Sequence, residues 1–274
     1  MRSLLRKFAP FLYSTGLAKR SYESLKQEII NSTWWYDFEL PCGTKLKSAA
    51  EPAEVNNGHY TRLKMLEEAL EEDLADKENI AQSTYLEFAS HQGWFATTMA
   101  KKGFRRCLGL EVRDRHIHMS TIMAQALGIQ NLEFQKADIF KLDPEEFGQW
   151  DYLTMFGLLY HVEDPVGALR LAYALTRKKF VIETQVGPNI EGEIDWGHHT
   201  YRKKLYGAFT LVDEHDDLEN PEASVTGICM VPSIEGLIWV MQKVGFRNVR
   251  LIEPPEDAYE QLAKKVRVVV VGEK

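Results

Sequence analysis

The chain has 274 residues, of which 45% are hydrophobic and 27% are charged, and this composition is that of a globular protein with a sizeable core. Its net charge of −7 argues against a protein that wraps a long polyanion such as tRNA or DNA. Cys42, Cys107 and Cys229 are too widely spaced for a disulfide framework or a zinc motif, so we expect a reduced, cytoplasmic protein without a metal. No apolar run reaches the length of a membrane span.

Residues 1–78 are predicted to form an N-terminal helical extension with one short strand. The first 30 residues carry apolar side chains at helical spacing and many basic residues, which favours a helix docked on the body; a helix on a membrane surface is the alternative. Residues Trp34–Leu40 alternate like a strand and end at the turn Pro41–Gly43. Leucines recur on one stripe of Tyr60–Lys77, which predicts an amphipathic helix.

Residues 79–274 alternate between strand and helix patterns, which predicts an α/β domain with a doubly wound, Rossmann-like sheet. The expected strands are Tyr85–Ala89, Arg106–Leu110, Leu132–Lys136, Trp150–Phe156, Lys179–Thr184, Phe246–Glu253 and Val266–Gly272. The expected helices are Trp94–Lys102, Arg113–Leu127, Pro165–Leu175 and Ser233–Val244. Residues 185–230 form a long polar stretch, which we interpret as a partly helical lid inserted over the active site.

Chemically distinctive residues follow four of these strands in turn. The first strand leads into the turn Glu87–Gly93, the second ends in Glu111, the third leads into Asp138, and the fourth is followed by Gly157–His161. This series resembles a class I S-adenosylmethionine-dependent methyltransferase. The resemblance implies S-adenosyl-L-methionine as the cofactor and a seven-stranded sheet, mostly parallel with an antiparallel last strand.

The first motif of that family reads acid, apolar, Gly, small, Gly, any, Gly. This chain has Ala89 and His91 in place of two glycines, which serve there for close backbone approach and unusual dihedral angles, and it retains Gly93. The resemblance places six residues of this turn at the cofactor, namely Glu87, Ala89, Ser90, His91, Gly93 and Trp94.

An acid at position 111 is suited to a ribose. A carboxylate there can accept hydrogen bonds from both ribose hydroxyls, and it would repel the 2′-phosphate of NADP. The alternative is a solvated acid at a strand end. By the same resemblance, Asp138 would accept from the exocyclic amine of adenine, Val112 and Ile139 would sandwich the base, and Phe156 would lie at the same edge.

A narrower resemblance comes from Gly157-Leu-Leu-Tyr-His161, the helix led by Asp164-Pro165, and Phe180-Val-Ile-Glu-Thr184. Together with Leu63-Lys64-Met65 and Met230-Val-Pro-Ser233, these segments are similar to the branch that includes the tRNA wobble-uridine carboxymethyltransferases. The similarity spans roughly residues 34 to 254. It implies that Lys64 holds a carboxylate of the cofactor; the alternative is a plain surface lysine. Thr226 stands where that branch has an arginine, which favours ordinary S-adenosylmethionine over its carboxy form.

Methyl transfer from a sulfonium requires an aligned nucleophile and, for some acceptors, removal of a proton. Tyr160 could orient the acceptor and His161 could act as a general base, since its ordinary pKa of about 6.5 suits neutral pH. The alternative is that both are packing residues. His198, in the insertion, is a second candidate base. The acidic and histidine-containing segments 195–199 and 213–217 could bind a divalent metal, but we favour a solvated acidic loop and expect no metal.

Three functions fit these features. We favour a methyltransferase that acts on oxygen, nitrogen or carbon of a small metabolite or biosynthetic intermediate, without nucleic acid or a membrane span. The first alternative is a tRNA wobble-uridine-modifying methyl or carboxymethyl transferase. The second is a non-catalytic, methyltransferase-like binding module, suggested by Ala89 and His91. The sequence leaves the oligomeric state open.

Overall fold

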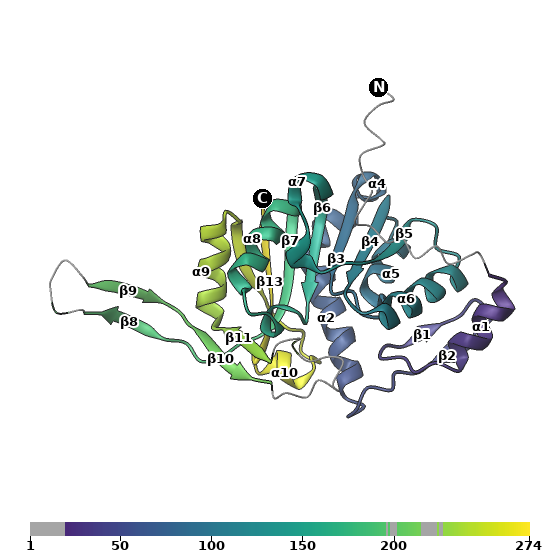
Figure 1. Cartoon of the computed structure of the whole chain (residues 1–274), viewed down its shortest axis with the longest axis horizontal. Coiled ribbons are helices and arrows are strands. Elements are labelled where there is room, and N and C mark those ends of the chain that lie inside the picture. Colours follow the sequence, from purple (N-terminus) through teal and green to yellow (C-terminus); the bar gives the residue numbers. More distant parts are fainter. Residues whose placement is uncertain (1–19, 196, 198–201, 215–223, 225–226) are drawn as a thin grey trace, which may run out of the picture.

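A seven-stranded sheet forms the centre of the computed structural model (Figure 1), which describes residues 20–195, 197, 202–214, 224 and 227–274. In spatial order its strands are β12 (Arg247–Ile252), β13 (Arg267–Glu273), β7 (Thr176–Gln185), β6 (Trp150–Phe156), β3 (Thr84–Phe88), β4 (Arg106–Glu111) and β5 (Leu132–Lys136). Strand β13 runs antiparallel to β7, and the strands from β7 to β5 are parallel to one another. The predicted Rossmann-like sheet with an antiparallel last strand is therefore confirmed.

The central strands are apolar runs because both faces of the sheet are covered. Every residue of β3 is buried, and alternate side chains belong to different clusters: Tyr85 packs into one, Leu86 and Phe88 into the other. Successive side chains of a strand point to opposite faces, so the parallel sheet needs apolar residues at both parities.

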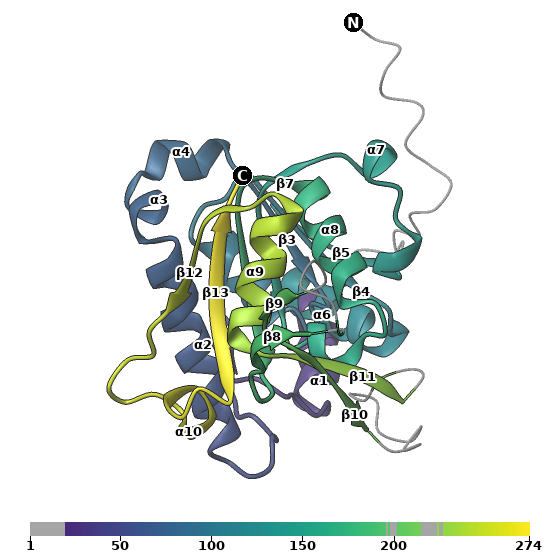
Figure 2. The same ribbon diagram turned by 90° about the vertical axis from the view of Figure 1, so that its left-hand side faces the viewer.

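Helices from distant parts of the chain form the two covering layers. Figure 2 shows α2 (Val55–Ala69) on one side of the sheet and α8 (Pro165–Leu175) and α9 (Ile234–Val244) on the other. Helices α5 (Trp94–Lys101) and α6 (Asp114–Ala126) add to the first layer, and their apolar faces share a cluster with Tyr85. Asp164 caps α8 and Ser233 caps α9 by accepting a hydrogen bond from a backbone N–H of the first turn, as N-cap residues do.

Short elements connect these layers. They are α3 (Glu71–Ala75), α4 (Lys77–Gln82), α7 (Pro144–Phe147), α10 (Glu260–Ala263) and the 3₁₀ turns η1 (Ile139–Lys141) and η2 (Leu159–His161). The predicted helix over residues 60–77 is wrong in its bounds, because α2 ends at Ala69 and two short helices follow. Asp76 starts α4 afresh by accepting a hydrogen bond from the Asn79 N–H.

The described residues before α2, residues 20–54, are largely irregular. Helix α1 spans Tyr22–Ile30, and residues 1–19 of the predicted first helix lie outside the described residues. The predicted strand over residues 34–40 is mostly wrong, since β1 is only Phe38–Glu39, paired with β2 (Lys45–Leu46). The backbone N–H of Trp35 bonds instead to the side chain of Gln92, in the turn after β3. The predicted domain boundary at residue 79 stays a prediction.

The insertion after β7 is made of strands in its described residues, so the prediction of a partly helical segment is wrong there. Strands β8 (Glu191–Ile194) and β9 (Lys203–Tyr206) form an arm that extends away from the body (Figure 1). Strands β10 (Phe209–Asp213) and β11 (Ile228–Pro232) pair in continuous antiparallel register, and β11 packs against η2. The β10–β11 pair therefore borders the carboxyl edge of the sheet, where η2 lies, whereas the described strands β8 and β9 point away from it.

Within the described part of the chain, no helix has both the length and the apolar character needed to traverse a bilayer.

We predict that Gln92 fixes the segment around Trp35 to the β3–α5 turn. Its Oε1 accepts from the Trp35 N–H at 2.7 Å, and its Nε2 donates to the Thr33 carbonyl at 3.2 Å. In a Gln92→Leu variant these part-buried groups lose their partner, which should lower the free energy of unfolding by about 0.5–1.5 kcal/mol per hydrogen bond in urea titrations. The exposed Gln130, changed to Leu, is the control and should cost less than about 0.5 kcal/mol. Equal losses in both variants would contradict this role.

Candidate cofactor and acceptor site

A cavity of about 1020 Å³ lies at the carboxyl ends of the parallel strands. This volume is sufficient for a nucleoside-sized ligand together with a small second molecule. Nine predicted site residues line it: Ala89, His91, Glu111, Val112, Asp138, Ile139, Phe156, Tyr160 and His161. The structure therefore brings together the loops that follow β3, β4, β5 and β6.

The β3–α5 turn keeps a glycine-like backbone without two of its glycines. Ala89 and His91 have φ of 51° and 49°, in the left-handed region, and Gly93 has φ of 76°. Left-handed geometry costs a non-glycine residue roughly 1–2 kcal/mol, which the surrounding fold offsets. A Cβ at position 93 would lie 2.3 Å from Cζ of Phe134, so glycine is required there for close packing against β5.

Glu111 is held in place by backbone donors. Its Oε2 accepts from the His91 N–H at 2.9 Å, and its Oε1 accepts from the N–H groups of Val112 and Arg113 at 2.8 and 3.0 Å. The side chain is buried and still lines the cavity. These bonds fix both oxygens, which keep further lone pairs for hydroxyl donors.

The far end of the cavity combines an acid with apolar side chains. Asp138 accepts from the Phe140 N–H at 3.1 Å and forms an ion pair with Lys141 at 3.0 Å. Val112 and Phe140 are 42% and 49% exposed and line the cavity, together with the buried Ile139. Phe140 was not predicted from the sequence, although it directly follows the predicted Asp138-Ile139 pair.

Five predicted cofactor residues do not line the cavity. Glu87 is buried and accepts from the Ala96 N–H at 2.8 Å, and burial raises its pKa well above the ordinary value. Ser90 is buried, Gly93 packs on Phe134, and Trp94 donates from Nε1 to the Asp37 carbonyl. Lys64 is exposed and pairs with Asp257 at 2.6 Å. The β3–α5 turn is therefore supported, on the side away from the cavity, by Glu87, Ser90, Gly93 and Trp94.

A buried charged network at the other end of the cavity was missed by the sequence reading. Arg267 donates from Nη1 to Glu183 Oε1 at 3.0 Å and from Nη2 to the Tyr160 hydroxyl at 2.8 Å. Arg62 Nε lies 3.4 Å from the same Glu183 oxygen. Burial alone would raise the pKa of Glu183, but Arg62 and Arg267 hold it below the ordinary value. The sequence signal for this network was an arginine at the start of the otherwise apolar strand Arg267–Glu273.

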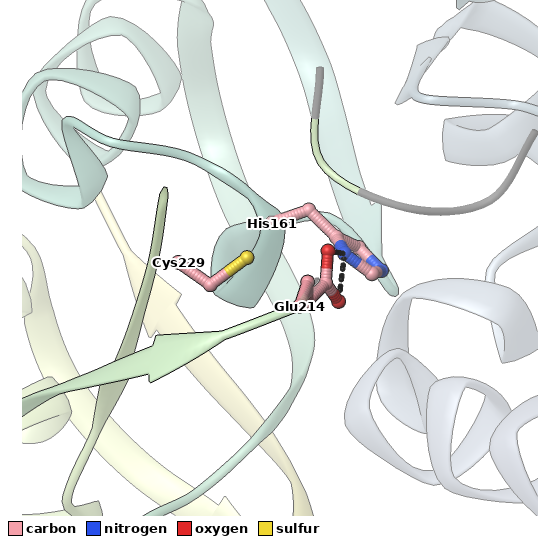
Figure 3. Close-up of side chains that lie close together, drawn as sticks. All are labelled: His161, Glu214 and Cys229. Carbon is pink, nitrogen blue, oxygen red and sulfur yellow. Dashed lines mark hydrogen bonds and ion pairs between the residues drawn. The ribbon is translucent and has the colours of Figure 1, made fainter. Parts of the chain in front are cut away.

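His161, Glu214 and Cys229 gather where η2 meets the β10–β11 pair, as Figure 3 shows. His161 Nδ1 lies 2.9 Å from Oε2 and 2.7 Å from Oε1 of Glu214, whose Oε2 also accepts from the Ser224 N–H at 2.6 Å. Burial lowers the pKa of His161, although Glu214 opposes this shift. Burial and Glu214 raise the pKa of Cys229 to about 12. The predicted His198 lies outside the described residues.

An aromatic wall closes the cavity on the side of the N-terminal segment. Trp35, Tyr36, His59 and His91 line it, and the rings of Tyr36 and His59 are 4.5 Å apart between centroids. His59 is 1% exposed, and its burial, followed by the nearby charge of Arg62, lowers its pKa to about 3. His59 is therefore neutral in the folded protein at any pH near neutrality.

The model of a family described as a methyltransferase domain matches residues 58–251. The tRNA U34 carboxymethyltransferase of Aliarcobacter butzleri is 23% identical over 186 residues, which are 64% of this chain and 50% of that protein. The ubiquinone biosynthesis O-methyltransferase of Acinetobacter baumannii (strain AYE) is 26% identical over 98 residues, which are 36% of this chain and 41% of that enzyme. The matched segments thus span half or less of the length of these curated relatives.

Solved structures share the fold. The N-terminal domain of EvdMO1 with SAH bound superposes with a TM-score of 0.67 at 19% identity, covering 93% of this chain and 97% of that one. The magnesium protoporphyrin IX methyltransferase of Synechocystis PCC 6803 with bound SAH gives a TM-score of 0.54 at 10% identity, covering 93% and 95%. At these identities the likeness establishes the architecture alone.

The buried His59 predicts a pH dependence of stability. Its folded pKa of about 3 lies below the unfolded value of about 6.5, so between these values the unfolded chain binds a proton that the folded chain does not. Stability from this site is present above about pH 6.5 and falls by up to about 1.4 kcal/mol per pH unit as the pH drops below it. Urea titrations of wild type and His59→Phe should show a shallower acid slope in the variant.

The variant His59→Gln, which is neutral at every pH, controls for altered packing and should share the shallower slope. An acid slope that is identical in all three proteins would show that His59 is not buried and neutral.

Proposed function

Because the chain belongs to the family described as a methyltransferase domain, we propose that it uses S-adenosylmethionine, bound at Glu111, to methylate a small molecule. The membership confirms the methyltransferase predicted from the sequence.

The cofactor assignment rests on the fixed carboxylate of Glu111. Two ribose hydroxyls need two aligned acceptors, and three backbone N–H groups hold the Glu111 oxygens at the cavity wall. Adenine would lie beside Asp138, between Val112 and Ile139, where apolar surface faces the cavity. The methionine part would lie toward Ala89 and His91. When bound, the cofactor supplies a methyl group already activated by its sulfonium. The solved structures that share this fold have SAH bound, which supports S-adenosylmethionine as the cofactor.

The acceptor would lie near η2, beyond the end of β6. The Tyr160 hydroxyl is held by Arg267, so it can orient an acceptor without itself moving, and this alignment is the main contribution of the protein to an in-line displacement. His161 lies beside it, with its ring 4.0 Å from that of Tyr160 between centroids, and Glu214 is bonded to Nδ1. His161 and Glu214 are thus the groups that handle a proton at this edge.

Several features favour a small acceptor. Trp35 and Tyr36, the start of α2, and Glu214 and Ser224 of the insertion all line the cavity, which narrows access to the methyl position. The net charge of −7 disfavours a long polyanion. The retained left-handed geometry at Ala89 and His91 removes the main reason to propose a non-catalytic module.

A tRNA substrate remains the second candidate, because the similarity to the tRNA U34 carboxymethyltransferase covers more of this chain than the similarity to the ubiquinone enzyme does.

We predict that Glu111→Gln weakens the binding of S-adenosylhomocysteine by at least about 10-fold, which corresponds to about 1.4 kcal/mol. An amide turns one acceptor into a donor that faces a backbone N–H, so both the ribose contacts and the turn are disturbed. Isothermal titration calorimetry measures the change, and Glu78→Gln, on the exposed surface of α4, should bind like the wild type. Unchanged affinity in Glu111→Gln, or no binding to the wild type, would refute the assignment.

We predict that the chain transfers labelled methyl from S-adenosylmethionine to a component of a small-molecule extract, and that it does not retain bulk tRNA at moderate salt. Incorporation into extract and tRNA is compared in parallel with the wild type and Glu111→Gln. Label in tRNA, with an affinity that falls steeply as salt rises, would instead support the tRNA candidate.

A further inference from the structure

Three side chains of the types that bind zinc face one another beside the proposed acceptor. Within the described residues, His161, Glu214 and Cys229 are the group of metal-ligating side chains whose donor atoms all lie within 4.8 Å of one another. They come from η2, from the residue that follows β10, and from β11, so the packing of β11 on η2 assembles them (Figure 3).

We propose that His161 Nδ1, a carboxylate oxygen of Glu214 and Cys229 Sγ bind a single zinc ion at the wall of the cavity. Imidazole, carboxylate and thiolate are the three ligand types of protein zinc sites, whereas magnesium and calcium require oxygen ligands. Zinc ligands at about 2.0–2.3 Å from the metal stand about 3.3 Å or more apart, so the 2.7 Å gap between His161 and Glu214 has to widen only slightly.

The surroundings suit such an ion. Cys229 is 1% exposed, and the side chains of His161 and Glu214 are 18% and 21% exposed, so the three ligands are largely shielded from bulk water. The Ser224 N–H holds Oε2 of Glu214, as outer partners do for metal-bound carboxylates. His161 and Glu214 also line the cavity, which leaves the fourth position of a tetrahedral ion on the side of the acceptor.

Charge and protons balance on binding. The thiol of Cys229 releases its proton to solvent, and the ring proton of His161 occupies Nε2 while Nδ1 binds the metal. One thiolate and one carboxylate then neutralise the two charges of the ion. With zinc bound, His161 serves as a ligand and no longer as a base.

The catalytic role of this zinc site rests on the proposed function, and it adds the substrate class to that function. An acceptor hydroxyl at the open position would have a lowered pKa, since a zinc ion acts as a Lewis acid on bound oxygen. Its proton would pass to solvent, the oxygen would form a bond to the methyl carbon, and the bond from that carbon to sulfur would break to leave S-adenosylhomocysteine. The inferred substrate class is therefore a hydroxyl-bearing molecule.

The test uses the full chain, purified without chelators or a histidine tag, and measures bound metal by elemental analysis and by competition with a chromophoric zinc chelator. We expect one zinc per chain. Replacement by cobalt should give the thiolate-to-cobalt charge-transfer absorption, which Cys229→Ser should abolish. Glu214→Gln should weaken zinc binding by at least about 10-fold. Cys107→Ser, at a buried cysteine outside the cluster, is the matched control and should behave like the wild type.

Circular dichroism establishes whether each variant is folded. If Cys229→Ser does not fold, the zinc affinity of Glu214→Gln still tests the site. Zinc well below one per chain, or a cobalt–thiolate band that persists without Cys229, would overturn the site and leave His161 and Glu214 as a metal-free pair. Calorimetry with S-adenosylhomocysteine on the metal-free protein is independent of this outcome. Loss of cofactor binding there counts against the proposed function, whereas loss of zinc counts against the metal site alone.

Discussion

The carboxylate of Glu111 fixes the turn after β3 to the loop after β4, at the carboxyl edge of the sheet. It ends β4, and it accepts hydrogen bonds from the backbone of the β3–α5 turn and from the first residues of the loop that leads into α6. A buried carboxylate with three backbone donors is well satisfied, and Arg113 Nη1 adds an ion pair at 3.8 Å from Oε1. The position of the turn, the wall of the cavity and the proposed ribose site all follow from this one side chain.

The sequence was sufficient to predict the sheet and to bring several of the predicted site residues to one cavity at its carboxyl edge. The strand Trp150–Phe156 has the same bounds in the structure as in the prediction, because a central parallel strand buried on both faces is an apolar run bounded by polar turns. Glu111, Asp138 and Tyr160 were found for a related reason: the carboxyl ends of parallel strands meet at one edge, so their position along the chain gives their position in space.

What the sequence did not reveal depends on tertiary contacts. Arg267 meets Glu183 and Tyr160 only because β13 inserts beside β7, and Cys229 meets His161 only because β11 packs on η2. The insertion was misread because its exposed strands, such as Glu191–Ile194, have no apolar alternation to distinguish them from a helix or a loop. Trp34–Leu40 was misread because Gln92 takes the Trp35 N–H that a longer strand would have used.

A crystal structure of the chain with S-adenosylhomocysteine bound tests the role of Glu111 directly. We expect both ribose hydroxyls to donate to the Glu111 carboxylate, with adenine beside Asp138 and the sulfur facing Tyr160 and His161. A nucleoside bound elsewhere, or one whose ribose makes no contact with Glu111, would contradict it.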